Sequence, residues 1–231
     1  MNGDRSFFGV WEFSGQTLPE MGRRDAGFDY EHSFAINSTL VAGTTLDSQG
    51  RKNVPHACLS CHGGYYDAAS RRVVGASLLP LIPARSKPQS DGDSVARMWS
   101  GDEARALNQI VLQSNPAPAI VDQINALYDG EPNTAGKTAN NTAVPSGWRT
   151  QQGLYKKVIE PYCSSCHFAQ RGPFNLRSWG NALQNKDAIQ RTMCTDFTMP
   201  HSEIQFRKFW SEDNGAAPRL LSTALGFQNC G

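Results

Sequence analysis

Cys58-Leu59-Ser60-Cys61-His62 and Cys163-Ser164-Ser165-Cys166-His167 are two copies of one pentapeptide pattern, C-x-x-C-H. In each copy two thiols stand three positions apart, and an imidazole directly follows the second thiol. A single C-x-x-C pair is also found in zinc half-sites and in redox-active dithiols. Two copies that both place a histidine in the same register favour a chemistry that uses all three side chains together.

That chemistry is the covalent attachment of c-type haem. Thiols at this spacing reach the two vinyl groups on one porphyrin edge and form thioethers, and the following histidine lies under the iron as its proximal ligand. The sequence therefore predicts two covalently bound haem c groups. The predicted thioether cysteines and iron-binding histidines are Cys58, Cys61, Cys163, Cys166, His62 and His167.

The composition agrees with a protein built around haem. Only 39% of the 231 residues are hydrophobic, which is lean for a core made of protein alone, and a porphyrin supplies apolar core material of its own. The 22 Lys and Arg residues nearly balance the 21 Asp and Glu residues, giving a formal net charge of +1. Nothing indicates a nucleic-acid partner, and no segment reaches the ~18 apolar residues that would span a bilayer.

Cys194 and Cys230 remain after the four motif cysteines. The number of remaining cysteines is even, and the chain is expected to mature outside the reducing cytoplasm. Together these points predict a disulfide between the two cysteines. Closing a loop of this size contributes about 3 to 4 kcal/mol in the chain-entropy model. The alternative is that Cys194 binds a haem iron as a thiolate.

The N-terminal residues bear on localisation. Residues 1–5 lack the positive start and apolar run of a secretory signal, yet covalent attachment of haem to C-x-x-C-H takes place after export. We therefore expect a secreted protein, periplasmic or extracellular, whose signal peptide or upstream region is absent from this sequence.

A polar stretch rich in Gly, Pro and Asn separates the two motifs and predicts a linker. The predicted N-terminal extension, first haem unit, linker and second haem unit are residues 1–45, 46–130, 131–147 and 148–231. The extension carries short β-type runs at residues 7–13 and 33–36. Composition predicts a loop at residues 47–55, before the first motif.

Helical periodicity predicts that both haem units are mainly α. In the second unit, apolar residues at helical spacing predict a helix over 153–159, and Pro161 is expected to end it. The other predicted helices are residues 102–112, 118–127, 187–193, 202–210 with Ser202 as N-cap, and 218–225 between Pro218 and Gly226.

Residues 148–231 resemble the class I cytochrome c fold. The resemblance is carried by a Tyr-containing helix, C-x-x-C-H, a distant Met199-Pro200 pair and a terminal helix. It implies that Met199 is the distal ligand of the second haem iron, with His201 as a less favoured alternative, and Met/His ligation raises the reduction potential. Tyr155 stands eight positions before Cys163, farther than in that family, which implies a longer or bent first helix.

The distal ligand of the first haem stays open. Residues 78–81, Leu-Leu-Pro-Leu, offer no ligand atom where a Met-Pro pair would be expected. His32 would give bis-histidine ligation. Met98 follows its motif at nearly the same spacing as Met199, but no proline follows it. With no protein ligand, the open iron would bind peroxide, nitrite or another small molecule.

Taken together, the sequence resembles a dihaem c-type cytochrome. The predicted function is single-electron transfer between redox partner proteins, as a carrier rather than an enzyme. One alternative is a dihaem redox enzyme, peroxidase-like or acting on a small oxyanion, with an open first haem. Another is an electron-transfer subunit or domain of a larger cytochrome assembly, which the partly apolar residues 1–40 would favour.

Overall fold

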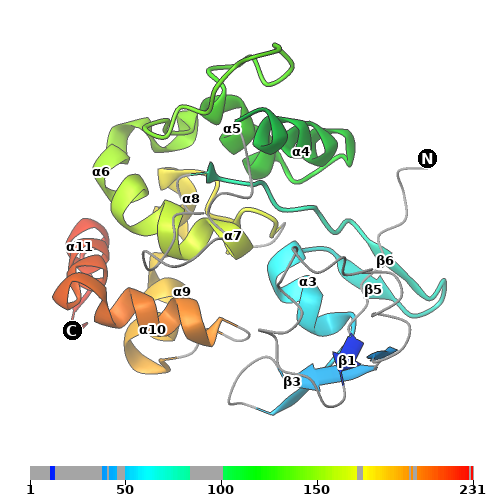
Figure 1. Cartoon of the computed structure of the whole chain (residues 1–231). Helices are drawn as coiled ribbons and strands as arrows, with labels where there is room; N and C mark the ends of the chain where they lie inside the picture. The colour runs from blue at the N-terminus through cyan, green and yellow to red at the C-terminus, as the bar shows by residue number, and fades with distance from the viewer. Residues whose placement is uncertain are drawn as a thin grey trace.

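The structure is a computed structural model that describes residues 11–13, 38–40, 42–45, 50–83, 101–170, 174–197, 199, 202–228 and 230. It is mainly helical, in agreement with the predicted class (Figure 1). The helices before the second motif are α3 (His56–His62), α4 (Gly101–Gln113), α5 (Pro118–Leu127), η4 (Ser146–Gln151) and α6 (Gln152–Leu154). Those that follow are η5 (Tyr155–Cys163), α7 (Ser164–His167), α8 (Trp179–Gln184), α9 (Lys186–Gln190), η6 (Arg191–Thr195), α10 (Glu203–Ser211), η7 (Glu212–Asn214) and α11 (Ala216–Leu225).

The described strands are short and pair antiparallel in twos. They are β1 (Trp11–Phe13) with β2 (Ser38–Leu40), β3 (Gly43–Thr45) with β4 (Arg51–Asn53), and β5 (Tyr65–Asp67) with β6 (Arg72–Val74). β1 lies in one of the predicted β-type runs, whereas residues 33–36 lie outside the described part. The expected loop at 47–55 is wrong over β4, because its polar residues pair with β3 through the backbone, which composition does not reveal.

Five predicted helices are confirmed, and the one predicted over residues 187–193 is formed by α9 and η6 in direct succession. α5 has the predicted bounds and starts with Pro118, whose fixed φ suits a first turn. α4 carries acidic residues in its first turn, where the helix dipole favours them. α10 starts after Ser202, although that side chain makes no capping bond. α11 ends at Gly226, which adopts a left-handed conformation with φ 70°.

Pro161 does not end the helix that leads into the second motif, which corrects the sequence-based expectation. The chain remains helical through η5, with Pro161 inside it, and passes directly into α7. η5 is π-helical, and such wider turns accommodate a residue that cannot donate to the i−4 carbonyl. The first helix is therefore longer than residues 153–159, as the unusual position of Tyr155 implied.

One hydrophobic core joins residues from both sides of the predicted linker. Ile120 and Ile124 of α5 belong to the same buried cluster as Trp148, Tyr155 and Val158. Trp148 is fully buried and its indole Nε1 donates to the carbonyl of Leu176 at 2.9 Å. The linker boundary itself stays a prediction, but the helices before it bury their apolar faces together with helices after it.

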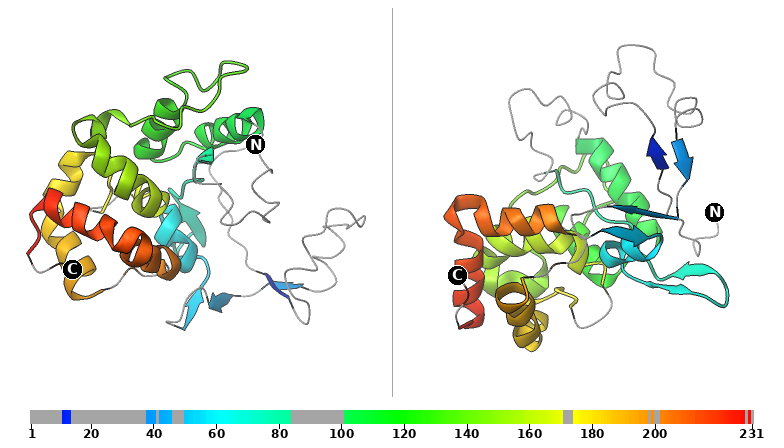
Figure 2. Two further views of the ribbon diagram at one scale, coloured as in Figure 1. Left: turned by 60° about the vertical axis from the view of Figure 1, so that its left-hand side comes forward. Right: turned by 90° about the horizontal axis from the view of Figure 1, so that it is seen from below.

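Contacts between helices position the motifs. α10 and α11 both pack against η5, and α3 packs against α7. Figure 1 shows α3 beside α7, with α11 toward the opposite edge of the molecule, and the same helices can be followed in the two views of Figure 2. A disulfide between Cys194 and Cys230 ties η6 to the end of the chain, so the pairing predicted from the even count is present. Within the described residues, no helix is both long and apolar enough for a membrane span.

A buried asparagine fixes the segment that follows the first motif. Asn108 on α4 is fully buried. Its amide oxygen accepts from the backbone N–H of Leu81 at 2.9 Å, and its amide nitrogen donates to the carbonyl of Leu81 at 2.8 Å. The same nitrogen donates to the Tyr128 hydroxyl. Nearby, the Ser77 hydroxyl accepts from the backbone N–H of Ala117 at 2.9 Å.

We predict that Asn108→Ala lowers the free energy of unfolding by about 1–3 kcal/mol, because both backbone groups of Leu81 lose their partner. Denaturant unfolding followed by circular dichroism measures the change. Asn133→Ala is the matched control, because Asn133 is exposed and such substitutions stay within about 0.5 kcal/mol. Equal midpoints for the two variants would contradict the prediction.

Candidate functional site

Each motif lies on a short helical segment that orients its side chains. Cys58 and Cys61 stand on α3, and His62 is its last residue. Cys163 ends η5, while Cys166 and His167 lie on α7. Residues three apart on a helix share a face, so each pair of thiols points to the same side. This is the arrangement that two bonds to one porphyrin edge require.

Both motif histidines have the same backbone anchor. The Nδ1 of His62 lies 2.8 Å from the carbonyl oxygen of Ser77, and the Nδ1 of His167 lies 2.8 Å from the carbonyl oxygen of Phe174. A carbonyl can only accept, so Nδ1 is the protonated nitrogen in each ring, and a neutral ring then has its lone pair on Nε2. Metal-binding histidines are typically oriented in this way.

The charge state of His167 also suits a metal ligand. Burial lowers the pKa of its imidazole below the ordinary range, and the hydrogen bond to Phe174 opposes this only in part. The neutral ring is therefore favoured at neutral pH, which is the form that coordinates iron.

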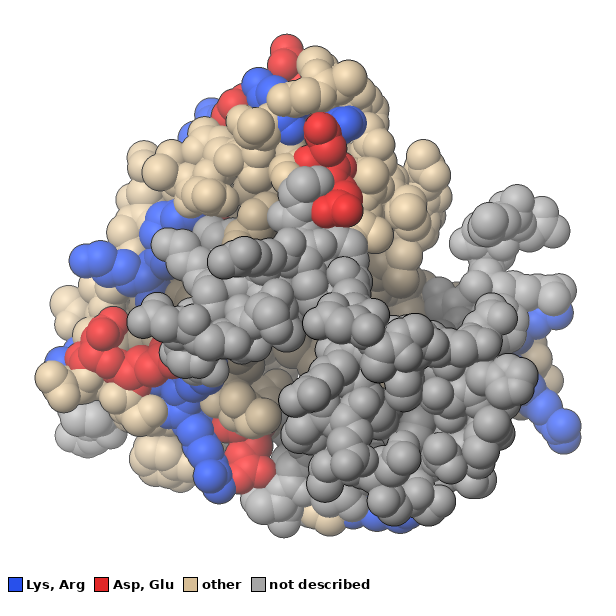
Figure 3. All heavy atoms as spheres, viewed as in Figure 1, with Lys and Arg blue, Asp and Glu red and all other residues tan. Residues whose placement is uncertain are grey.

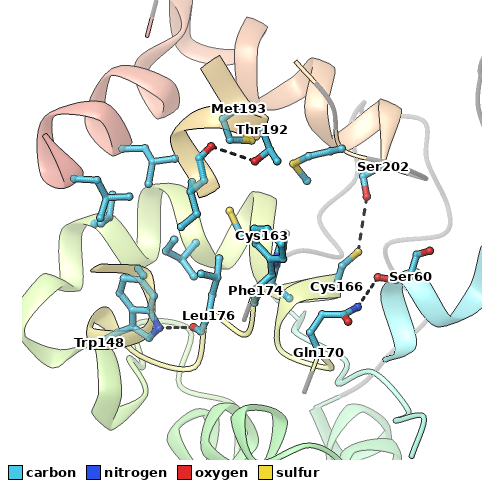
Figure 4. Close-up of a pocket in the computed structure, with 18 residues that line it drawn as sticks. Ser60, Trp148, Cys163, Cys166, Gln170, Phe174, Leu176, Thr192, Met193 and Ser202 are labelled. Carbon is cyan, nitrogen blue, oxygen red and sulfur yellow. Dashed lines mark hydrogen bonds between the residues drawn. The ribbon is translucent and has the colours of Figure 1, made fainter. Parts of the chain in front are cut away.

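An apolar cavity of about 320 Å³ lies against the second motif (Figure 4). Cys163, Cys166 and His167 all contribute to its wall. The apolar part of the lining is Trp148, Leu154, Ile159, Phe174, Leu176, Ala182, Ile189, Leu221 and Leu225. A largely apolar cavity with a few convergent ligating groups is the usual form of a cofactor site.

Two thioether side chains complete this cavity. Met199, the predicted distal ligand, lies in the lining. Met193 of η6 lines it as well and is buried; Figure 4 shows it across the cavity from Cys163. Met193 carries no comparable signal in the sequence, because it ends a predicted helix and no proline follows it.

The residues present therefore fit a covalently bound haem at the second motif. The two thiols and the imidazole contribute to one wall, methionine sulfurs are available within the same cavity, and apolar side chains supply the remaining surface. Cys194, the alternative thiolate ligand, is in the disulfide and does not line the cavity.

The two motifs touch. The Sγ atoms of Cys61 and Cys166 lie 2.9 Å apart, and the side-chain amide of Gln170 donates to the carbonyl of Ser60 at 2.6 Å. The hydrogen bond with Cys166, and then burial, raises the pKa of Cys61, and burial raises that of Cys58. Both thiols are therefore protonated at neutral pH in this arrangement.

No set of three or more His, Cys, Asp or Glu side chains converges as metal ligands in the part of the chain that the structure describes. The four motif cysteines are all described, so they do not form the closed tetrahedral centre of a structural zinc site.

Several predicted ligand positions lie outside the described residues. These are His32, Met98 and His201, and Pro200 of the Met199-Pro200 pair is also outside them. Residues 78–81 are described, and Leu79 packs against the hydrophobic core. This segment contributes packing and, through Leu81, hydrogen bonds to Asn108. The distal side of the first haem therefore stays a prediction.

No protein-family model, curated protein or solved structure matches this chain. The interpretation of the site consequently depends on its own residues and their geometry.

Tyr162 anchors the chain immediately before the second motif. Its hydroxyl donates to Oε2 of Glu212 at 2.7 Å, and its ring meets Phe209 edge-on with the ring centroids 5.8 Å apart. Burial, followed by the hydrogen bond to the Glu212 carboxylate, raises the pKa of Tyr162 to about 12. These contacts hold the entry to the motif against α10 and η7.

We predict that Tyr162 ionises near pH 12 and that Glu212→Gln shifts its titration to lower pH, because the neighbouring negative charge is removed. The folded-state pKa is raised, so the Tyr162 contribution to stability is complete below about pH 10, the ordinary tyrosine value. It is lost as the pH rises through about 12. Carbon-13 NMR of labelled tyrosine rings measures the titration, and Tyr162→Phe assigns the signal. An unchanged titration in Glu212→Gln would contradict the prediction.

Proposed function

We propose that this protein is a dihaem c-type cytochrome that transfers single electrons between redox partner proteins. The observation that supports it best is the cavity that brings Cys163, Cys166 and His167 into one lining with Met199. The matching backbone anchor on both motif histidines supports the same chemistry at the first motif.

Haem bound at these motifs supplies a one-electron Fe(III)/Fe(II) couple. The cysteines would fix each porphyrin edge, and the histidines would hold the iron through Nε2. Met199 would offer a soft thioether sulfur to the iron, and such a ligand favours Fe(II) and raises the potential. Apolar side chains of the lining would surround the porphyrin, and the carbonyl of Phe174 keeps the ring of His167 oriented.

The partners we propose are redox proteins or a larger cytochrome assembly outside the cytoplasm. Figure 3 shows Lys and Arg interspersed with Asp and Glu over the described part of one face, as expected from the near-neutral total charge. This mixed surface does not resemble the basic face of a nucleic-acid binder. The disulfide between Cys194 and Cys230 supports export, because such bonds persist in oxidising compartments.

Haem content tests the proposal directly. The full chain, produced in a host that matures c-type cytochromes, should carry two covalent haems by intact mass and by haemochrome absorbance. Cys58→Ala with Cys61→Ala, and Cys163→Ala with Cys166→Ala, should each leave one haem. Cys194→Ser with Cys230→Ser is the matched control and should keep both. A colourless wild-type protein would refute the proposal.

The distal ligand is tested by two isosteric substitutions in the same cavity. Met199→Leu should open the second iron, so the reduced protein should bind one more equivalent of carbon monoxide per chain than the wild type does. Met193→Leu should leave carbon monoxide binding unchanged, since both substitutions preserve volume and only one removes the proposed ligand. The reverse pattern would make Met193 the ligand.

The same titration separates the carrier from the enzyme alternative. A wild-type protein whose two haems are both six-coordinate with protein ligands should not bind carbon monoxide. Uptake of one equivalent by the wild type, retained when the second motif is removed, would place an open iron at the first haem. That result would favour a dihaem redox enzyme over a pure carrier.

A further inference from the structure

The contact between the two motifs involves the last cysteine of each. Cys61 and Cys166 are 105 positions apart in sequence, yet their sulfurs lie 2.9 Å apart. Both are the cysteine that directly precedes the iron-binding histidine. One contact between the two predicted haem sites is therefore made by a pair of atoms that would each be bonded to a porphyrin substituent.

A glycine makes this close approach possible. Gly63 directly follows His62 and is buried, with φ 68°. A Cβ at this position would collide with the carbonyl group of Ala169, whose carbon would lie 2.8 Å away. Ala169 stands two positions after His167, so the backbones that follow the two motifs pass each other in direct contact.

The cavity at the second motif also extends to the first. Ser60, which lies between the two cysteines of the first motif, is part of its lining. Gln170 closes the contact by donating to the Ser60 carbonyl, and Figure 4 shows this bond at the rim beside Cys166. The first motif thus forms part of the wall around the second haem site.

From these contacts we propose that the two haems are immediate neighbours, meeting at the thioether sulfurs of Cys61 and Cys166, and that they form one electronically coupled pair. The inference rests on the proposed function and deepens it. Each thioether sulfur is one bond from a carbon substituent of its porphyrin. Once both sulfurs are alkylated, the hydrogen bond between the thiols is lost and the sulfurs relax to van der Waals contact, at about 4 Å.

The coupled step is a one-electron exchange. With haem held at each motif, one iron would pass from Fe(II) to Fe(III) while the other passes from Fe(III) to Fe(II), with no bond or proton exchanged. Since charge on one haem would act on a close neighbour, adding the first electron would also make the second harder to add. The pair should therefore take up its two electrons at separated potentials even where the ligands are alike.

Circular dichroism in the Soret region tests the contact without any partner or substrate. Two porphyrins in contact should give a two-signed band in the wild-type holoprotein. The sum of the two single-haem variants, Cys58→Ala with Cys61→Ala and Cys163→Ala with Cys166→Ala, should lack this band. A wild-type spectrum equal to that sum would overturn the inference while leaving the dihaem proposal standing. A wild-type protein without haem would instead refute the proposed function.

Glycine substitutions then test the structural cause. Gly63→Ala should weaken or abolish the two-signed band, because the added methyl group pushes the motifs apart. Gly136→Ala is the matched control: Gly136 also has a positive φ, of 73°, but nothing lies within 4 Å of its added Cβ. The control should keep the band.

A second variant covers the case in which Gly63→Ala does not fold. Gln170→Ala removes only the side-chain bond to Ser60 and should shift the band toward the single-haem sum. A band that persists undiminished in every folded variant of Gly63 and Gln170 would overturn the assignment of the coupling to this contact.

Discussion

The packing of α3 against α7 is the constraint on which the rest of the site depends. It brings the C-x-x-C-H segments together through Cys61 and Cys166, and it succeeds because Gly63 has no side chain to collide with Ala169. η5 runs directly into α7. The contact between α3 and α7 therefore also connects the first motif to η5, the helix that leads into the second motif. The two motifs are therefore parts of one structural unit at this point.

Helices α4 and α5 make buried hydrogen bonds that hold the segments on either side of that contact. Gln123 of α5 donates to the Tyr155 hydroxyl and to Ser164 inside the second motif, while Asn108 of α4 holds the segment after the first motif. α4 and α5, which both precede the predicted linker, thus hold residues within the second motif and after the first. Buried polar contacts of this kind are specific, because an unpaired donor or acceptor in the core is costly.

Much of the local structure could be predicted from sequence, because it depends on neighbours along the chain. Periodicity and end signals located α4, α5, α10 and α11. The prediction failed where non-local or atypical backbone geometry decided the outcome. β4 requires pairing with β3, and Pro161 is accommodated by a π-helical turn. Met193 carried no local signal, since only the fold places it beside Met199 in one cavity.

The sequence by itself determined which reactive groups each motif carries: two thiols and an imidazole at fixed spacing on a short helix. It also determined that two further cysteines remain and that a methionine follows the second motif. These follow from covalent order and helical geometry. Only the tertiary structure decided that the motifs adjoin, that Ser60 lines the cavity of the second motif, and that Ser77 and Phe174 orient the two histidines. Those outcomes depend on how segments far apart in the chain pack, and packing is a property of the whole core rather than of any one stretch of sequence.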